Sequence, residues 1–294
     1  MLDTQVISSY TTDMNKLPNE TRIQILQMLC EGSSMRSISR IAGVSINTVT
    51  KLLVDAGKAC SAYHDENVKG IKARRVQADE IWSFCYSKQK TAVNNNNPNA
   101  GDVWTWTAFD ADSKLIISYM VGNRDTDSAI LLMDDLRKRL ENRVQLTTDG
   151  HRAYLDAVEG AFGENVDYAQ LIKLYGPSAD YAKGRYSPAE CTGAKKTPVS
   201  GKPDSDHIST SYVERQNLNM RMGMRRFTRL TNAFSKKMEN HCFALALYFM
   251  FYNFVRIHKT LKVTPAMASG VTNKLWEMAD LVNMIDEFHA KDSN

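Results

Sequence analysis

The spacing of apolar residues between positions 76 and 174 constrains the fold more than any other feature of this chain. Short apolar runs with two-residue alternation predict strands, and a run with helical spacing at 127–140 predicts a helix. Turn-forming residues at 110–113 join the second predicted strand to the third. A hairpin meander followed by alternating helices and strands predicts an α/β fold, a mixed sheet covered by helices. The predicted strands cover residues 76–86, 103–109, 115–121, 144–148 and 169–174.

A helical segment at 17–57 precedes this sheet. Its second and third predicted helices cover 35–42 and 46–55, with Gly43 in the turn between them and Ser45 as the N-cap of the third. Two short helices joined by a glycine-containing turn predict a helix-turn-helix unit. The residues predicted to form its core are Ile38, Ile41, Val44, Val49 and Leu52.

The exposed face of the third predicted helix, which Gly57 is expected to end, carries Asn47, Thr48 and Lys51. These side chains have the reach and chemistry to contact base edges and phosphates in a DNA major groove. A three-helix bundle used for protein contacts is the alternative interpretation.

Three acidic residues occupy positions that such a sheet would bring together. Asp79 lies within the first predicted strand, Asp149 directly follows the fourth, and Glu214 lies on a helix after a long loop. Clustered carboxylates repel one another unless cations neutralise them, and Mg²⁺, with Mn²⁺ as its substitute, prefers oxygen ligands. Two such ions about 4 Å apart stabilise both the attacking and the departing oxygen of a phosphodiester displacement. The three acids therefore predict a two-metal site for phosphodiester cleavage and transfer.

Spacing alone does not select these three, because the chain has 33 acidic residues. Asp149 also fits a plain turn residue, and Glu214 fits a solvated charge on a helix surface. Asp79 is the hardest to explain in that way, since aspartate is disfavoured within a strand and its neighbours Ile81 and Trp82 indicate burial.

The local sequences around the three acids are QADEIWSF, LTTDGHRAY and SYVERQNLNMR. Together with VWTWTAFDADSKLIISYMVG and FYNFVRIHKTLKVTPAMASG, they resemble bacterial DDE transposases of the insertion-sequence-one-like family over about two thirds of the chain. The resemblance implies a ribonuclease H-like catalytic domain with Asp79, Asp149 and Glu214 as its metal-binding triad. It also implies that Arg221, two helical turns after Glu214, lies near substrate DNA.

A basic stretch follows Glu214. Residues 215–237 contain seven basic residues and no acidic one, which favours phosphate binding along DNA that enters the site. A solvated charged face is the alternative. The residues of this stretch that we expect to contact DNA are Arg221, Arg225, Arg226 and Arg229.

These features predict a succession of parts along the chain. A loop inserted at 176–206 holds four of the seven prolines and four of the fifteen glycines. The predicted parts are an N-terminal segment at 1–16, a helix-turn-helix DNA-binding domain at 17–57, a basic linker at 58–75, a ribonuclease H-like domain at 76–265 and a helical tail at 266–294.

Composition and charge exclude several classes of protein. Five cysteines without a C-x-x-C pair fit neither a disulfide framework nor a structural zinc site, so reduced thiols in the cytoplasm are expected. The longest apolar run, 242–252, is about half of the ~20 residues needed to span a bilayer and predicts a buried helix instead. The net charge of +4 barely indicates a nucleic-acid partner, so only the distribution of charge supports one.

The prediction for function is a bacterial, nucleoid-associated transposase that cuts double-stranded DNA at transposon ends and joins the released 3′ hydroxyl to target DNA. Handling two ends in concert implies a homo-oligomer on DNA, with no membrane partner. Two alternatives stay open. A helix-turn-helix regulator would show no magnesium dependence, and a metal-dependent nuclease would cut without forming a joined product.

Overall fold

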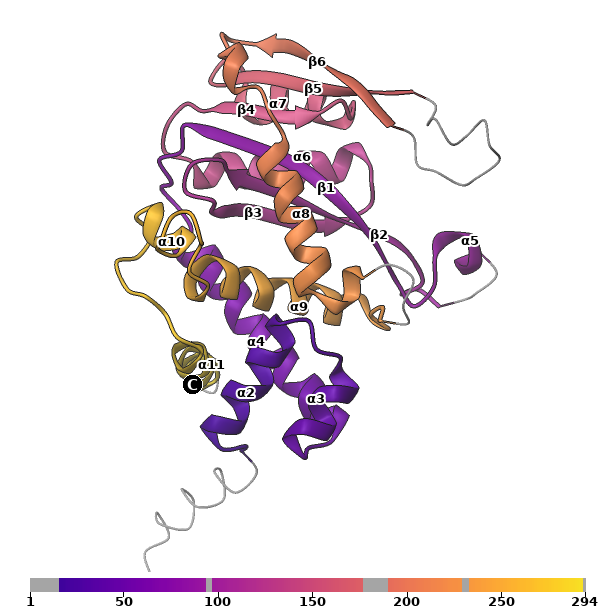
Figure 1. Cartoon of the computed structure of the whole chain (residues 1–294), viewed down its shortest axis with the longest axis vertical. Coiled ribbons are helices and arrows are strands. Elements are labelled where there is room, and N and C mark those ends of the chain that lie inside the picture. The colour runs from indigo at the N-terminus through magenta and orange to yellow at the C-terminus, as the bar shows by residue number, and fades with distance from the viewer. Residues whose placement is uncertain (1–15, 94–96, 177–189, 229–232, 293–294) are drawn as a thin grey trace, which may run out of the picture.

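In the computed structural model, residues 16–93, 97–176, 190–228 and 233–292 are described. They form a six-stranded mixed sheet in the order β3-β2-β1-β4-β5-β6, with three helices at the N-terminus extending from one end (Figure 1). The strands are β1 (Arg75–Cys85), β2 (Gly101–Asp110), β3 (Ile116–Gly122), β4 (Gln145–Asp149), β5 (Asp167–Gly176) and β6 (Glu190–Ser200).

The pairing directions define the type of sheet. β1, β2 and β3 form an antiparallel meander, whereas β1, β4 and β5 run parallel to one another. This order and these directions are those of a ribonuclease H-like domain, so the predicted α/β fold class is confirmed. The prediction of an irregular loop at 176–206 is wrong in part, because β6 pairs antiparallel with β5 over 190–200. The rest of that loop between β5 and β6, 177–189, lies outside the described residues.

Helices cover both faces of the sheet. α6 (Thr126–Arg139) and α7 (Ala153–Phe162) pack together on one face, and their buried side chains include Leu132 and Tyr154. On the other face, α8 (Ser211–Gly223) crosses β1 and β2 (Figure 1). The core therefore lies on both sides of β1, the strand that carries Asp79.

The N-terminal helices form the predicted helix-turn-helix arrangement, with α2 (Asn19–Cys30), α3 (Met35–Ala42) and the start of α4 (Ile46–Asn67). The backbone N–H of Ser37 donates to Ser34 Oγ, and that of Thr48 donates to Ser45 Oγ, each at 3.1 Å, so both helices begin with a serine cap. Gly43 adopts the left-handed conformation, φ 66°, that ends α3.

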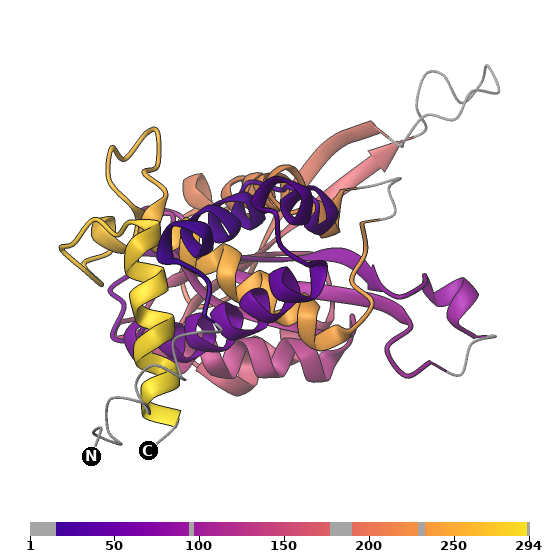
Figure 2. The ribbon, with the colours of Figure 1, turned by 90° about the horizontal axis from the view of Figure 1, so that it is seen from below.

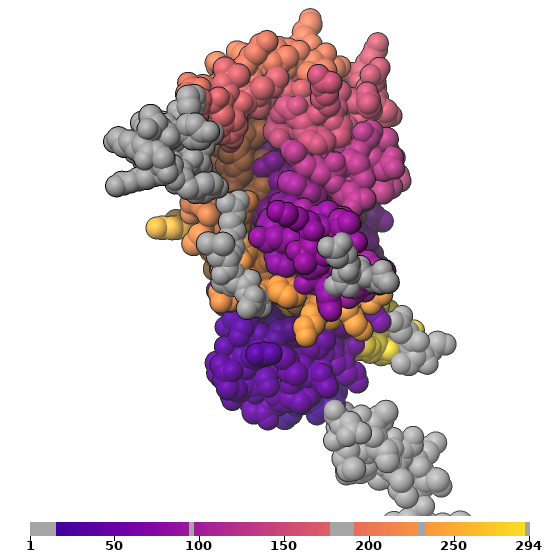
Figure 3. All heavy atoms as spheres, turned by 90° about the vertical axis from the view of Figure 1, so that its right-hand side faces the viewer, coloured from indigo at the N-terminus to yellow at the C-terminus, as the bar shows by residue number. Residues whose placement is uncertain are grey.

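Most of the predicted core of this unit is buried, with Ile38 and Val49 fully enclosed. The placement of Ile41 in that core is wrong, because its side chain is 61% exposed. α3 has only eight residues, so Ile38 fills its inward turn and Ile41, near the C-terminal end, stays in solvent. The N-terminal helices form a rounded lobe beneath the rest of the molecule in Figure 3.

α4 is longer than the sequence suggested. The prediction that it ends at Asp55, before a linker, is wrong, because the helix continues through Gly57 to Asn67. Gly57 faces α9 (Met238–Met250) so closely that an added Cβ would lie 2.3 Å from Cβ of Phe243. The glycine permits close packing of two helices rather than ending one, and it makes α4 a continuous connection from the N-terminal helices to the sheet domain.

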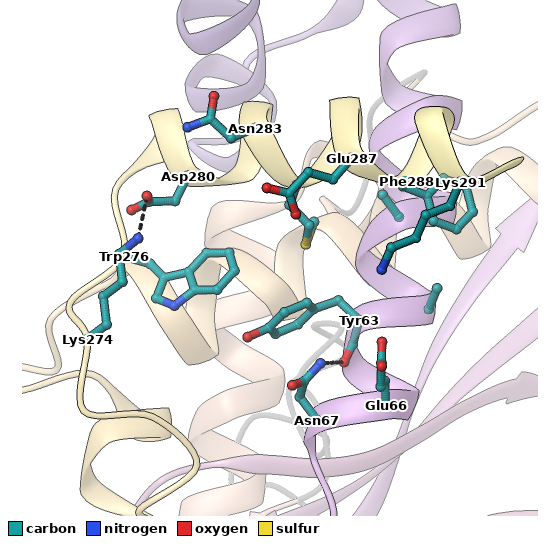
Figure 4. Close-up of a pocket in the computed structure, with 13 residues that line it drawn as sticks. Tyr63, Glu66, Asn67, Lys274, Trp276, Asp280, Asn283, Glu287, Phe288 and Lys291 are labelled. Carbon is teal, nitrogen blue, oxygen red and sulfur yellow. Dashed lines mark hydrogen bonds and ion pairs between the residues drawn. The ribbon is translucent and has the colours of Figure 1, made fainter. Parts of the chain in front are cut away.

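The C-terminal helix α11 (Met278–Asp292) packs on α2 and α4, and Figure 2 shows it alongside the N-terminal helices. The guanidinium of Arg22 donates to both carboxylate oxygens of Asp286, at 3.0 and 2.7 Å. Between α4 and α11 lies a pocket of about 510 Å³, lined in part by Tyr63 and Trp276, whose rings meet edge to face (Figure 4).

The remaining described elements include short segments as well as the predicted buried helix. The apolar run 242–252 falls within α9 and the π-helical turn at Phe251–Val255, and it is largely buried as expected. None of the described helices combines the length and apolar character that crossing a bilayer requires. The short elements are α5 (Gln89–Ala92), α10 (Pro265–Ala268) and the 3₁₀ turns η2 (Ser205–His207) and η3 (Arg225–Phe227).

Candidate metal centre and DNA-facing surface

Asp79 and Asp149 come together because β1 and β4 are parallel neighbours. Ala78 pairs with Thr148, so the next residue on each strand is one of the two aspartates. One carboxylate oxygen from each of Asp79, Glu80 and Asp149 lies within 4.8 Å of the others. The backbone N–H of His151 donates to Oδ1 of Asp149 at 2.9 Å, which fixes this carboxylate at the end of β4. The structure therefore places two of the three predicted acids in one cluster.

The environment of Asp79 disfavours its negative charge. Burial, followed by the neighbouring charges of Glu80 and Asp149, raises the pKa of Asp79 from 3.8 to about 7, and Glu214 adds a smaller contribution. Nδ2 of Asn217 donates to Oδ2 of Asp79 at 2.8 Å. A carboxyl group held in this way gains much from a nearby cation.

This raised pKa predicts that the metal-free protein loses stability as pH rises. Between about pH 4 and 7 the folded state keeps a proton on Asp79 that the unfolded chain has released, so the free energy of unfolding falls across this window. We expect Asp79→Asn, which cannot ionise, to be more stable than the unmodified protein at pH 8 by on the order of 2–4 kcal/mol and nearly equal at pH 4.

Urea denaturation with EDTA at both pH values measures this difference. A difference in free energy of unfolding that is the same at both pH values would contradict the raised pKa of Asp79. Added Mg²⁺ is expected to restore stability at pH 8 only to the protein that retains Asp79.

Glu214 reaches the same region from the first turn of α8. The backbone N–H groups of Tyr212 and Val213 donate to Oε1 of Gln77 at 2.9 and 3.1 Å, which anchors the start of α8 two residues before Asp79 on β1. One turn beyond Glu214, Asn217 contacts Asp79. The helix is thus held to the strand on both sides of the glutamate.

The carboxylate of Glu214 nevertheless already forms an ion pair and a hydrogen bond with other residues. Nζ of Lys173, on β5, lies 2.5 Å from Oε2, and the Thr210 hydroxyl donates to Oε1. Glu214 is not one of the three residues whose oxygens approach within 4.8 Å. The structure therefore places it beside Asp79 but paired with a lysine, not in the cluster itself.

Glu80 is a member of this cluster that the sequence interpretation missed. Its side chain is 1% exposed, and it accepts hydrogen bonds from Nε of Arg124 at 2.7 Å and from the hydroxyl of Tyr154 at 3.0 Å. Burial, and then the charge of Asp149, raise the pKa of this carboxyl. Two adjacent acids within a strand whose neighbours are apolar were the available signal, since buried acids are rare without a partner.

The sequence interpretation also missed two cationic side chains at this site, Arg124 and Lys173. The guanidinium of Arg124 lies over the ring of Trp104, 4.9 Å from its centre, and 4.0 Å from Oδ2 of Asp149. Lys173 is the second cation. When all four carboxylates are ionised, these two cations leave two negative charges in excess. An oxygen-rich cluster with that excess fits a hard divalent cation.

The predicted DNA contacts fall on two surfaces. On α4, Asn47 and Lys51 are exposed as expected, whereas Thr48 is partly buried and its hydroxyl lies 2.9 Å from Ser45 Oγ. Beyond α8, Arg225 is exposed on η3.

Of the other predicted contacts, Arg221 is partly buried on α8, two turns beyond Glu214. Arg226 is partly buried on η3 and lines a cleft together with Asn47 and Arg225. Arg229 lies outside the described residues.

Comparison with known proteins adds little to these observations. No family model matches the sequence, and no curated protein matches it. Among solved structures, a chain of a pre-cleavage Mos1 transpososome matches at 13% sequence identity with a TM-score of 0.21. That match covers 56% of this protein and 64% of the Mos1 chain, which is less than two thirds of its length.

Proposed function

We propose that this protein is a DNA transposase that cleaves phosphodiester bonds at the ends of a mobile element and joins the released 3′ hydroxyl to target DNA. The observation that carries the proposal is the convergence of Asp79 and Asp149 at adjacent parallel strands of a ribonuclease H-like sheet, with Glu214 held beside them. The resemblance of the surrounding sequences to the insertion-sequence-one-like family supports strand transfer in addition to phosphodiester cleavage.

In this proposal Asp79, Asp149 and Glu214 hold two divalent ions, Mg²⁺ or Mn²⁺. Such ions supply Lewis-acid activation of the attacking oxygen and neutralise charge on the phosphate. Asn217 orients Asp79 through its amide at 2.8 Å. Arg124 neutralises Glu80 within the cluster, which leaves the more exposed Asp149 carboxylate accessible from solvent.

Lys173 has a separate role in the proposal. Its ammonium compensates Glu214 when no other cation is near, because an ion pair at 2.5 Å satisfies the carboxylate. Release of Lys173 frees Glu214 for the site and leaves a mobile cation close to the position of the reacting phosphate.

The direct test is a strand-transfer assay with the full-length protein, duplex DNA carrying the ends of its own element, a target plasmid and Mg²⁺. Joined products that disappear with EDTA support the proposal. Cleavage without joining would support a nuclease instead. DNA binding with neither product, with or without Mg²⁺, would support a helix-turn-helix regulator.

The identity of the third acid is a prediction of its own, because Glu80 lies closer to the two aspartates than Glu214 does. Glu80 is already neutralised by Arg124 and hydrogen-bonded by Tyr154, whereas the side chain of Lys173, the partner of Glu214, is one third exposed and can move away from the carboxylate. We expect Glu214→Gln to lower strand transfer by at least ~10³-fold, and Glu80→Gln to lower it by only about tenfold, through loosening of Arg124.

Single-turnover rates at saturating Mg²⁺ measure both effects. The reverse order, with Glu80→Gln as the inactive variant, would transfer the role of third acid to Glu80.

A further inference from the structure

A cleft separates the helix-turn-helix head from the catalytic part of the molecule. It has a volume of about 710 Å³, and its walls come from α2, α3 and α4 on one side and from η3 and α9 on the other. The N-terminal turns of α3 and α4 both open on it, and helix N-termini attract anions. The lining side chains include four cations and, among the described residues, no acid. The cations are Arg36, Arg225, Arg226 and Lys236.

Arg226 is the most buried of these cations, because the side chains of the other three are exposed. Its Nε donates to the Ser235 hydroxyl at 2.7 Å, and its other described contact is the sulfur of Met35 at 4.0 Å. No carboxylate among the described residues forms an ion pair with it. Burial lowers the pKa of Arg226 to about 10, and its charge adds to the effect of burial in lowering the pKa of the neighbouring His241. A guanidinium withdrawn from water is normally paired with an anion.

We propose that this cleft binds a phosphodiester strand of the same DNA duplex that α4 reads, so that the head and the catalytic part hold one duplex between them. The inference rests on the proposed function in taking DNA as the substrate. It adds a binding site, built from both parts, in which Arg36 takes part although it was not expected to contact DNA, together with Lys236 from the basic stretch 215–237.

The position of the cleft relative to the acidic cluster supports DNA over an acidic protein as its occupant. α8 runs from Glu214 towards the head and ends at Gly223, just before Arg225 (Figure 1). At 1.5 Å per residue this path is roughly 14 Å long, which corresponds to about four base pairs of duplex. Arg221 lies on the same helix, so cations follow the path from the acids to the cleft.

The test measures the affinity of the 294-residue protein for duplex DNA that carries one end of the mobile element. Fluorescence anisotropy in EDTA gives this affinity across a series of salt concentrations. Arg36→Met and Lys236→Met remove exposed cations without removing any described hydrogen bond, so they should fold normally. Each is expected to weaken binding roughly threefold to tenfold and to reduce the slope of log affinity against log salt by about one. Arg226→Met should have a larger effect, but it also removes the contact with Ser235.

Lys138→Met is the matched control, because Lys138 is an exposed lysine on α6, away from both the cleft and the acidic cluster, and this variant should bind as the unmodified protein does. Neutral methylphosphonates placed about four base pairs from the cleaved end should weaken binding by the unmodified protein but not by Arg36→Met.

Unchanged affinity and salt slope in both Arg36→Met and Lys236→Met would overturn the inference, even if strand transfer were observed. Unchanged DNA binding with altered self-association would instead identify the cleft as a protein contact. Failure of the proposed function looks different, because the unmodified protein would then form no joined product whatever the cleft binds.

Discussion

Asp79→Asn is expected to lower the rate of metal-dependent strand transfer by at least ~10³-fold. The reason is that several kcal/mol of transition-state stabilisation depend on the ions that this carboxylate would hold. DNA affinity in EDTA should change less than about twofold, since the predicted DNA contacts lie on α4 and beyond Glu214 rather than at Asp79. Strand-transfer rates at saturating Mg²⁺ and anisotropy titrations measure the two effects separately.

Loss of folding cannot account for this result, because the same substitution is expected to stabilise the metal-free protein above pH 7. Asp156→Asn is the control, since Asp156 is an exposed acid on α7 and should leave strand transfer unchanged. Full activity in Asp79→Asn, with Mg²⁺ dependence retained, would remove Asp79 from the catalytic role and with it the basis of the proposal.

The sequence was informative where a local pattern fixes a local structure. Alternation of apolar residues identified β1 and β4, and an aspartate within or directly after each strand was enough to expect their meeting, because neighbouring parallel strands align their residues. Serine caps and the turn at Gly43 identified the helix-turn-helix in the same way.

What the sequence could not reveal depends on contacts between distant segments. Glu80 is neutralised by Arg124, 44 residues later, and Glu214 is held by Lys173, 41 residues earlier. Neither pair has a spacing that repeats along a helix or strand, so no periodicity indicates it. The lone acid on α8 was identifiable only through its neighbours in sequence, whereas its actual distance from the cluster is set by the hydrogen bonds of Gln77 to the backbone of α8.

β6 was missed for a different reason. Its sequence, ECTGAKKTPVS, is polar and contains glycine and proline, so it has little of the alternation that predicts a strand. As the edge strand of the sheet it pairs only with β5, and an edge position tolerates proline and lysine.

Gly57 shows how one residue can mislead a prediction and still be decisive in the fold. A glycine after a run of helical spacing usually ends a helix, yet here it lies within α4 where α9 approaches its backbone. An added Cβ would lie 2.3 Å from Cβ and 2.6 Å from Cα of Phe243. Since these are atoms close to the backbone of a packed helix, the clash cannot be relieved by rotating a side chain.

Gly57→Ala is therefore expected to lower the free energy of unfolding by about 3 kcal/mol or more, despite the better helix propensity of alanine. Gly160→Ala is the matched control, because Gly160 is also within a helix, α7, and has no atom within 4 Å of the added Cβ. That variant should be about 0.5–1 kcal/mol more stable than the unmodified protein.

Urea denaturation of both variants compares their stabilities directly. Limited proteolysis of Gly57→Ala should release the N-terminal helices first, because the packing of α4 on α9 connects them to the sheet domain. Equal stability of the two variants would show that α4 and α9 do not pack as closely as Gly57 allows.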